Sequence, residues 1–171
     1  MSTHVIGYRP ADAEWDKMFE VEDAVRAELI DDPDDPPTSR ALRRRLAEDP
    51  GPLAEPYRWT AWAGDEMVGV CRAGFTPPTS PEYADNKHIV NVFVEVAQGH
   101  RRRGVFRRLL EPALAKAVAK GVTTVQTVTF HDAGRAAGRH WDGTLAMEAA
   151  ENRLKLAEVD WAMVRGWEAE G

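Results

Sequence analysis

The sequence predicts an α/β (α+β) domain, in which helices alternate with strands that join in one sheet. Three observations support this fold class. Strand-like and helix-like periodicities alternate along the chain from the amino terminus onward. The segment 88–96 (HIVNVFVEV) is apolar on both faces, as a central strand covered on both sides would be. A long amphipathic helix follows that segment after a short loop.

The beginning of the chain is predicted to form a strand and two helices. Residues 4–9 alternate weakly as a strand, and Asp12 is an N-cap for the first helix. Segment 31–37 is a loop, because each proline restricts its own backbone and that of the preceding residue. Thr38 or Ser39 caps a short helix that ends at the breaker 49–52. The apolar residues that share one face are Trp15, Met18, Val25 and Leu29 in the first helix, and Leu42 and Leu46 in the second.

The middle of the chain is predicted to supply most of the sheet. Residues 57–63 and 67–75 flank a glycine-containing connection, 64–66, whose length is typical of a hairpin. A proline-rich loop leads from this hairpin to the segment 88–96, which we expect at the centre of the sheet. Residues 123–130 are rich in β-branched side chains and predict another strand.

The long helix is the clearest helix of the sequence. Its apolar residues recur from Phe106 onward at spacings of three and four, and Gly121 stands where helices commonly stop. Pro112 removes one hydrogen bond inside this helix and is expected to bend its axis. A less regular region at 131–144 follows. The last helix is marked by Leu156, Val159, Met163 and Trp167.

Composition and charge exclude several classes of protein. The length of 171 residues, with 43% hydrophobic and 29% charged residues, is typical of one globular domain. No apolar run can cross a membrane, and the first residues lack a secretory pattern, so a cytoplasmic protein is expected. Cys71 is the only cysteine, which excludes an internal disulfide and a cysteine-based zinc site. The net charge of −6 disfavours nucleic-acid binding, for which only the basic run 101–108 is available.

The feature that points to function is the sequence QGHRRRGVFRR at 98–108, between the central strand and the long helix. The first turn of a helix has unpaired N–H groups and partial positive charge, so it binds pyrophosphate readily. Gly104 lets the backbone approach such a ligand. The alternative is a basic face that contacts only solvent, but the position between strand and helix favours a phosphate site. The arginines that can add charge are Arg101, Arg102, Arg103, Arg107 and Arg108.

These residues resemble the signature of the GNAT superfamily of N-acetyltransferases: Arg or Gln, two residues, Gly, one residue, then Gly or Ala. Residues 101–106 match it except at Phe106, and the predicted elements follow the family's order. The resemblance implies the acyl-CoA N-acyltransferase fold, with a central mixed sheet flanked by helices, and acetyl-CoA as cosubstrate. It implies that backbone groups near Val94 and Val96 pair with the pantetheine arm, and that amides of 101–106, including Val105, hold the pyrophosphate. Because Phe106 replaces a small residue, weak coenzyme binding is an alternative.

The resemblance also implies direct attack of an amine on the thioester, without a nucleophilic side chain or a metal. An alkylamine with a pKa of about 10.4 is mostly protonated at pH 7, so a base assists. Glu95 is the best candidate base, because an apolar strand can raise its pKa; the alternative is a glutamate facing solvent or paired with an arginine. The family's tyrosine, which protonates the thiolate, is missing, and Asp142 takes its place beside Trp141. His131 and His140 are weaker candidates for that role.

We expect residues 1–157 to form the acetyltransferase domain and residues 158–171 to form a carboxy-terminal helix. Trp161 and Trp167 need cover, which three arrangements would supply: packing on this domain, a homodimer, or a second GNAT domain as in tandem GNAT proteins. The other expected partner is the acceptor amine. The acidic segment 31–35 lies where the family builds part of its acceptor site, although charge runs are commonly solvated loops. Two functions stay open: an active N-acetyltransferase for a small-molecule or protein amine, and a non-catalytic GNAT-like domain that binds coenzyme or a partner. A nucleic-acid or membrane partner is not expected.

Overall fold

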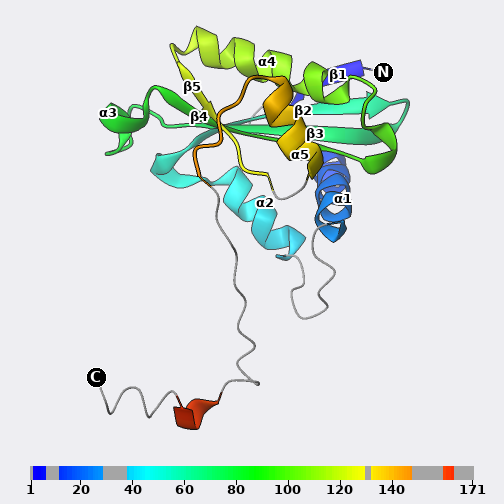
Figure 1. Cartoon of the computed structure of the whole chain (residues 1–171), viewed down its shortest axis with the longest axis horizontal. Helices are drawn as coiled ribbons and strands as arrows, with labels where there is room; N and C mark the ends of the chain where they lie inside the picture. The colour runs from blue at the N-terminus through cyan, green and yellow to red at the C-terminus, as the bar shows by residue number, and fades with distance from the viewer. Residues whose placement is uncertain (1, 7–11, 29–37, 130–131, 148–159, 164–171) are drawn as a thin grey trace. The chain divides into compact units, whose positions relative to one another are not determined.

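The structure is a computed structural model that describes residues 2–6, 12–28, 38–129, 132–147 and 160–163 (Figure 1). Contacts within the chain divide it into two compact units, Met1–His131 and Asp132–Gly171. The domain boundary predicted after residue 157 lies outside the described residues and stays a prediction. The acidic loop 31–37 also lies outside them.

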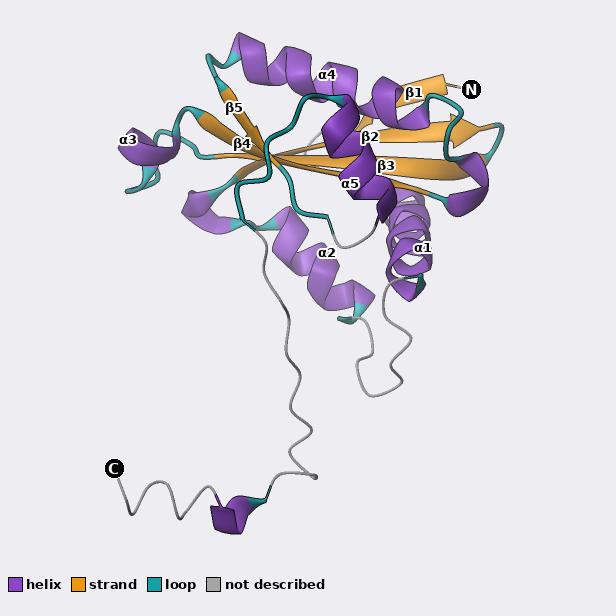
Figure 2. Ribbon diagram, in the orientation of Figure 1, coloured by secondary structure: helices purple, strands orange, loops and turns teal. Residues whose placement is uncertain are grey.

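The first unit is built on a mixed sheet, which Figure 2 draws in orange. The pairs β1–β2, β2–β3 and β3–β4 are antiparallel, and the pair β4–β5 is parallel. The predicted hairpin of β2 and β3 and the mixed sheet are thus confirmed. In spatial order the described strands are β1 (Ser2–Ile6), β2 (Glu55–Ala63), β3 (Glu66–Phe75), β4 (Ile89–Val96) and β5 (Thr124–Gln126).

Helices cover both faces of the sheet in the first unit, with α4 on one face and α1 and α2 on the other (Figure 1). Ser39 is the predicted N-cap of α2, since its Oγ accepts a hydrogen bond from the Leu42 N–H at 3.3 Å. Leu42 and Leu46 are 37% and 58% exposed, and α2 buries none of its side chains. The described helices of this unit are α1 (Asp12–Ala27), α2 (Arg40–Glu48), the short α3 (Tyr83–Asn86) and α4 (Val105–Ala119).

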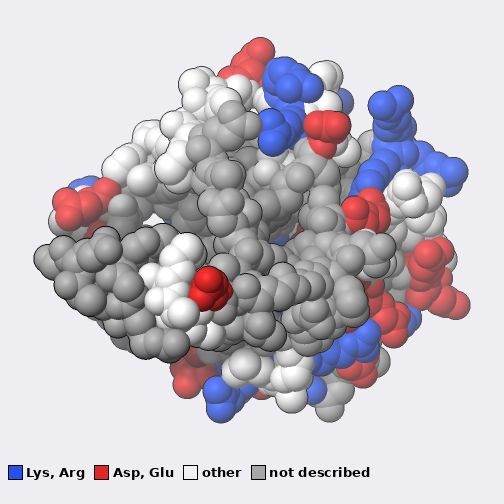
Figure 3. Space-filling view, turned by 60° about the horizontal axis from the view of Figure 1, so that its bottom comes forward, with Lys and Arg blue, Asp and Glu red and all other residues white. Residues whose placement is uncertain are grey.

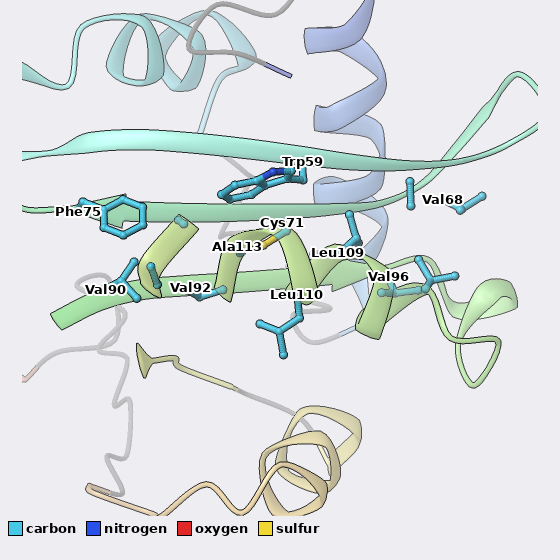
Figure 4. Close-up of a cluster of buried hydrophobic side chains, with 14 residues drawn as sticks. Trp59, Val68, Cys71, Phe75, Val90, Val92, Val96, Leu109, Leu110 and Ala113 are labelled. Carbon is cyan, nitrogen blue, oxygen red and sulfur yellow. The ribbon is translucent and has the colours of Figure 1, made fainter. Parts of the chain in front are cut away.

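The larger apolar core lies between α4 and the sheet, because every second residue of the strands points to this side (Figure 4). Gly69 on β3 sets how closely α4 approaches. A Cβ at this position would lie 2.9 Å from Leu109 Cδ1 and 3.1 Å from Val105 Cγ1. The glycine therefore lets the first turns of α4 lie directly against the strand. The core includes Trp59, Cys71, Phe75, Val90, Val92, Val96, Val105, Leu109, Leu110, Ala113 and Ala117.

The predicted ends of α4 are confirmed. Gly121 has φ +73°, its N–H donates to the Val118 carbonyl, and the Val122 N–H donates to the Ala117 carbonyl. This pair of hydrogen bonds is the glycine-terminated ending that the sequence indicates. Pro112 lies inside the helix, as predicted. In α1, the predicted buried residues Trp15, Met18 and Val25 are also confirmed.

Two predictions about the sheet are wrong. The segment 88–96 is not covered on both faces, since Asn91 is exposed and Phe93 is 37% exposed on the face opposite α4. This happens because α1 packs mainly on β3, which is the middle one of the five described strands. The strand predicted at 123–130 is also shorter, with only Thr124–Gln126 paired to β4.

The second unit contains a helix that was not predicted. Residues 131–144 were expected to be irregular, but α5 (Asp132–His140) lies within them. Its glycines lower the helix propensity, whereas Asp132 in the first turn and Arg139 in the last turn complement the helix dipole. Of the predicted last helix, Met163 lies in a described helical turn, while Leu156, Val159 and Trp167 lie outside the described residues.

Candidate active site

The loop between β4 and α4 reverses the backbone at two left-handed residues. Arg102 has φ +58° and Gly104, the N-cap of α4, has φ +77°. A left-handed conformation costs a side-chain-bearing residue roughly 1 kcal/mol, and such strain gathers at functional sites. The first hydrogen bond of α4 runs from the Arg108 N–H to the Gly104 carbonyl at 3.1 Å. The amides of 105–107 precede it, so they have no acceptor within the helix and are oriented as an anion site requires.

The arginines of the run 101–108 differ in their surroundings. Arg102 and Arg103 are exposed, and Arg107 is 72% exposed beside Glu111, whose Oε1 lies 2.6 Å from its Nε. Arg101 is instead only 24% exposed, and its guanidinium is hydrogen-bonded to Glu28 and to the Val96 carbonyl. The sequence predicts a single basic patch at 101–108. In the structure, Arg101 is held by other residues of the protein, whereas Arg102, Arg103 and Arg107 are exposed.

Phe106 packs against the apolar core under α4. Its large side chain is therefore accommodated by the core cluster that also holds Val105 and Leu109. The backbone of the same residue belongs to the first turn of α4, where the predicted pyrophosphate amides lie.

The edge of β4 that faces β5 is only partly paired. The parallel pairing ends at Asn91 opposite Gln126, whereas β4 continues to Val96. Among the described residues, no strand lies beside 92–96 on that side. An extended ligand can pair with this backbone as an added strand would, and Val94 and Val96 lie within this stretch.

Glu95 lies on the opposite face from α4, in a charged network drawn from four elements. Arg72 of β3 donates from Nη2 to Glu95 Oε1 at 3.2 Å, and its Nη1 lies 3.6 Å from Glu22 Oε1 of α1. Arg43 of α2 donates to Glu22 Oε2 at 3.1 Å and to Asp23 Oδ1 at 2.6 Å. Glu95 Oε2 is buried, without a hydrogen-bond partner within the described part of the chain. The carboxylate thus has one oxygen paired with Arg72 and one buried oxygen without a partner in the described part of the chain.

Burial raises the pKa of Glu95 above its ordinary value. The positive charges of Arg72 and Arg43 oppose this shift, and the negative charge of Glu22 adds to it. Glu95 therefore has the raised pKa expected of a base and also the arginine partner of the alternative interpretation. Its role as a base stays a prediction. A carboxylate with a raised pKa is a better proton acceptor than an ordinary one.

The partners of Glu95 were missed in the sequence, although two signals were present. Arg72 is the one basic residue in the otherwise apolar run 67–75. Glu22 lies four residues after Met18 and three before Val25, so it occupies the apolar stripe of α1. A charged residue at a core-facing position needs a partner, which points to a buried ion pair.

Asp142 terminates α5. Its φ is +55°, its N–H donates to the Arg139 carbonyl at 3.2 Å, and the Gly143 N–H donates to the Gly138 carbonyl at 2.8 Å. These two bonds form the helix ending that usually has glycine at this position. Asp142 is exposed, as is His140, whose ring lies edge-on to Trp141. His131 lies outside the described residues.

Cys71 is fully buried, and burial raises the pKa of its thiol to about 12. The thiol therefore stays protonated at neutral pH and is not a nucleophile. Among the described residues, no three His, Cys, Asp or Glu side chains come together as a metal site. No helix within the described ranges is long and apolar enough to cross a membrane. Basic and acidic side chains alternate over the described surface seen in Figure 3.

Residues 15–140, more than half of the chain, match the model of the Acetyltransferase (GNAT) family. The chain belongs to this family, which confirms the resemblance found in the sequence. A search of curated proteins with the sequence finds no match.

Solved structures of acetyltransferases share this fold at low sequence identity. An aminoglycoside acetyltransferase, meta-AAC0020, from an uncultured soil metagenomic sample, solved with sisomicin, is 12% identical with a TM-score of 0.63, over 91% of this chain and 95% of that one. A ribosomal-protein-alanine N-acetyltransferase from Brucella melitensis biovar Abortus 2308 is 13% identical with a TM-score of 0.62, over 90% and 99%. AAC(6')-Iy, solved with the bisubstrate analogue CoA-S-monomethyl-acetylneamine, is 14% identical with a TM-score of 0.56, over 90% and 97%.

Proposed function

We propose that the chain transfers an acetyl group from acetyl-CoA to a primary amine of a small molecule or protein by direct attack. The observation that carries this proposal is the run from β4 into α4. It combines an unpaired strand edge at 92–96, a left-handed loop and the first turn of a helix in one continuous segment. Glu95, a desolvated carboxylate, is the penultimate residue of the same strand.

The residues of this segment have separate roles in the proposed binding of acetyl-CoA, which supplies the acetyl thioester. The backbone around Val94 and Val96 pairs with the pantetheine arm. The amides of 102–106 hold the pyrophosphate, and the exposed Arg102, Arg103 and Arg107 add positive charge beside it. The fit rests on the helix start and its glycine, because backbone amides can approach a phosphate closely only where no side chain intervenes.

Glu95 is the proposed base. Its carboxylate accepts the proton that the amine loses, directly or through a water molecule. As the amine nitrogen bonds to the acyl carbon, the bond from that carbon to sulfur breaks. A backbone N–H near the end of β4 stabilises the negative charge that develops on the thioester oxygen. Water protonates the thiolate, since the proton-donating tyrosine of the family is missing and Asp142 stands at its position.

The test of this base is steady-state turnover with acetyl-CoA and a panel of primary amines. We expect Glu95→Gln to lower kcat/KM about 100-fold or more at pH 7, as loss of a general base does. The deficit should shrink at higher pH, where the amine loses its proton without help. Glu48→Gln is the matched control, because Glu48 forms an ion pair with Arg44 on the surface of α2. Unchanged turnover of Glu95→Gln at pH 7 would remove Glu95 from the mechanism.

A second candidate function is coenzyme binding without turnover. It is favoured by Asp142, whose geometry is that of a helix terminator and not of a proton donor. Tight binding of acetyl-CoA with no transfer to any amine of the panel would select this function. A second copy or a further GNAT domain then becomes the proposed partner, with Trp161, 48% exposed, on the contact surface.

A further inference from the structure

One arginine of the basic run is held by the protein itself. Arg101 donates from Nη1 to Glu28 Oε2 at 2.7 Å and from Nη2 to Glu28 Oε1 at 2.9 Å. Its Nε donates to the Val96 carbonyl at 3.0 Å. The pair is bidentate, a geometry in which both terminal guanidinium nitrogens and both carboxylate oxygens are used. Each partner is only about a quarter exposed.

The three groups come from three different parts of the first unit. Glu28 directly follows α1, Val96 ends β4, and Arg101 begins the turn that leads to α4. Glu28 and Arg101 are 73 residues apart in the chain. The ion pair therefore closes a long-range contact at the point where the strand passes into the phosphate loop.

The backbone on both sides of Arg101 is fixed in the same way. The Ala97 N–H donates to the Val68 carbonyl at 3.0 Å, and the His100 N–H donates to the Ala97 carbonyl at 2.9 Å. The N–H of Arg101 itself donates to the Gln98 carbonyl at 3.3 Å. Its amide is thus used inside the loop, and its side chain is used against α1. The amide and three of the five guanidinium N–H groups of Arg101 therefore already have partners.

We propose that Arg101 is a positioning residue and not a phosphate ligand, and that the Glu28–Arg101 ion pair holds the loop so that the amides of 102–106 face the pyrophosphate. The inference rests on the proposed binding of coenzyme A. It predicts the opposite sign from a direct phosphate contact. If Arg101 left Glu28 to bind phosphate, removing the charge of Glu28 would release the arginine and tighten binding.

The experiment is calorimetric titration of the full chain with coenzyme A. We expect Glu28→Gln to weaken binding about fivefold to tenfold, as loss of a partly buried ion pair does. Glu111→Gln is the matched control, because Glu111 pairs with Arg107 of the same run and its loss should leave binding equal or tighter. Glu28→Gln with Arg101→Gln should bind no more weakly than the weaker single variant, since both break one interaction. Binding by Glu28→Gln that equals or exceeds that of the parent overturns the proposal.

A second measurement separates this inference from the proposed function. If the parent protein binds no coenzyme A, the proposed function fails, but the ion pair is still tested by amide hydrogen exchange without ligand. Glu28→Gln should speed exchange of the loop amides at 98–104 relative to the parent and to Glu111→Gln. Equal exchange in all three proteins contradicts the positioning role, whatever the protein binds.

Discussion

The two faces of the sheet are built by different means. On the face under α4, side chains from three strands and one helix form a continuous apolar core around residues such as Cys71 and Leu109. On the other face, a smaller apolar cluster that includes Trp15, Met18 and Val70 lies between α1 and the sheet. Beside it, Arg72 forms ion pairs with Glu95 and Glu22, which join β3 to β4 and α1. The first face holds the proposed coenzyme helix in place, and the second surrounds the proposed base. Apolar packing thus supports the proposed cofactor site, and neighbouring charges set the pKa of the proposed base.

The difference teaches which kind of site can be adjusted by a single side chain. A close-packed core responds to added volume with strain, and it transmits that strain to the element it supports. A network of partly buried charges responds to the loss of one member with a changed pKa, and the fold can stay the same. A pair of matched substitutions on each face tests this difference.

The largest effect is expected on the packed face, at Gly69. Gly69→Ala places a Cβ 2.9 Å from Leu109 Cδ1 and 3.1 Å from the Glu95 carbonyl, so the Leu109 side chain or α4 itself must shift. We expect the free energy of unfolding in urea to fall by about 1–3 kcal/mol. The control is Gly74→Ala on the same strand, where an added Cβ meets nothing within 4 Å. Equal stability of the two variants would show that Gly69 does not set the position of α4.

The next effect is expected on the charged face, as opposite shifts in the pH dependence of kcat/KM. Arg72→Met removes a positive charge beside Glu95, so the pKa of Glu95 should rise and the acidic limb should move to higher pH by about one unit. Glu22→Gln removes a negative charge, so the same pKa should fall and the limb should move to lower pH. Arg43, which opposes the raised pKa, is unchanged in both variants.

The sign for stability is the reverse of the sign for activity. The folded pKa of Glu95 lies above its unfolded value, so the native state holds more protons between the two, and stability falls as pH rises through that window. Arg72→Met should widen this window and Glu22→Gln should narrow it. Shifts of both variants in the same direction would mean that Glu95 is not the group that titrates.

The smallest effect is expected at Cys71, which the packed face keeps neutral. Because burial raises the pKa of this thiol to about 12, iodoacetamide should not modify the native protein at pH 8. Cys71→Ala should change kcat within about twofold, since direct attack by an amine needs no thiol nucleophile. Rapid alkylation that also abolishes turnover would indicate a covalent route instead.

The helix α4 and the loop before it could be predicted from the sequence because their signals are local. The spacing of Leu109, Ala113 and Ala117, the glycine after the helix, and the basic loop before it lie within one continuous segment. The hairpin turn at Gly64 is equally local. A helix start and a turn depend on a few neighbouring residues, and short-range patterns therefore predicted them.

The ion pairs of Glu95 and Arg101 could not be predicted in the same way. Glu95 was identified as the candidate base, but its partner Arg72 is 23 residues away, and Glu22, which pairs with the same arginine, is farther. The Glu28–Arg101 pair spans 73 residues, so no local pattern indicates it. The helix α5 was missed because glycines at 134 and 138 weaken its propensity, although its helix-terminating bonds show a regular ending. Long-range pairing is a property of the folded chain that a periodicity does not contain.

The central claim is that the start of α4 binds the pyrophosphate of acetyl-CoA, and calorimetric titration of two glycine variants tests it most directly. Gly104 and Gly121 lie at opposite ends of α4, both have left-handed φ, and an added Cβ meets nothing within 4 Å at either. Gly104→Asp and Gly121→Asp therefore introduce similar backbone strain and the same charge. We expect Gly104→Asp to abolish micromolar binding of acetyl-CoA and Gly121→Asp to keep the affinity of the parent. Equal affinities in both variants, with both folded, would contradict it.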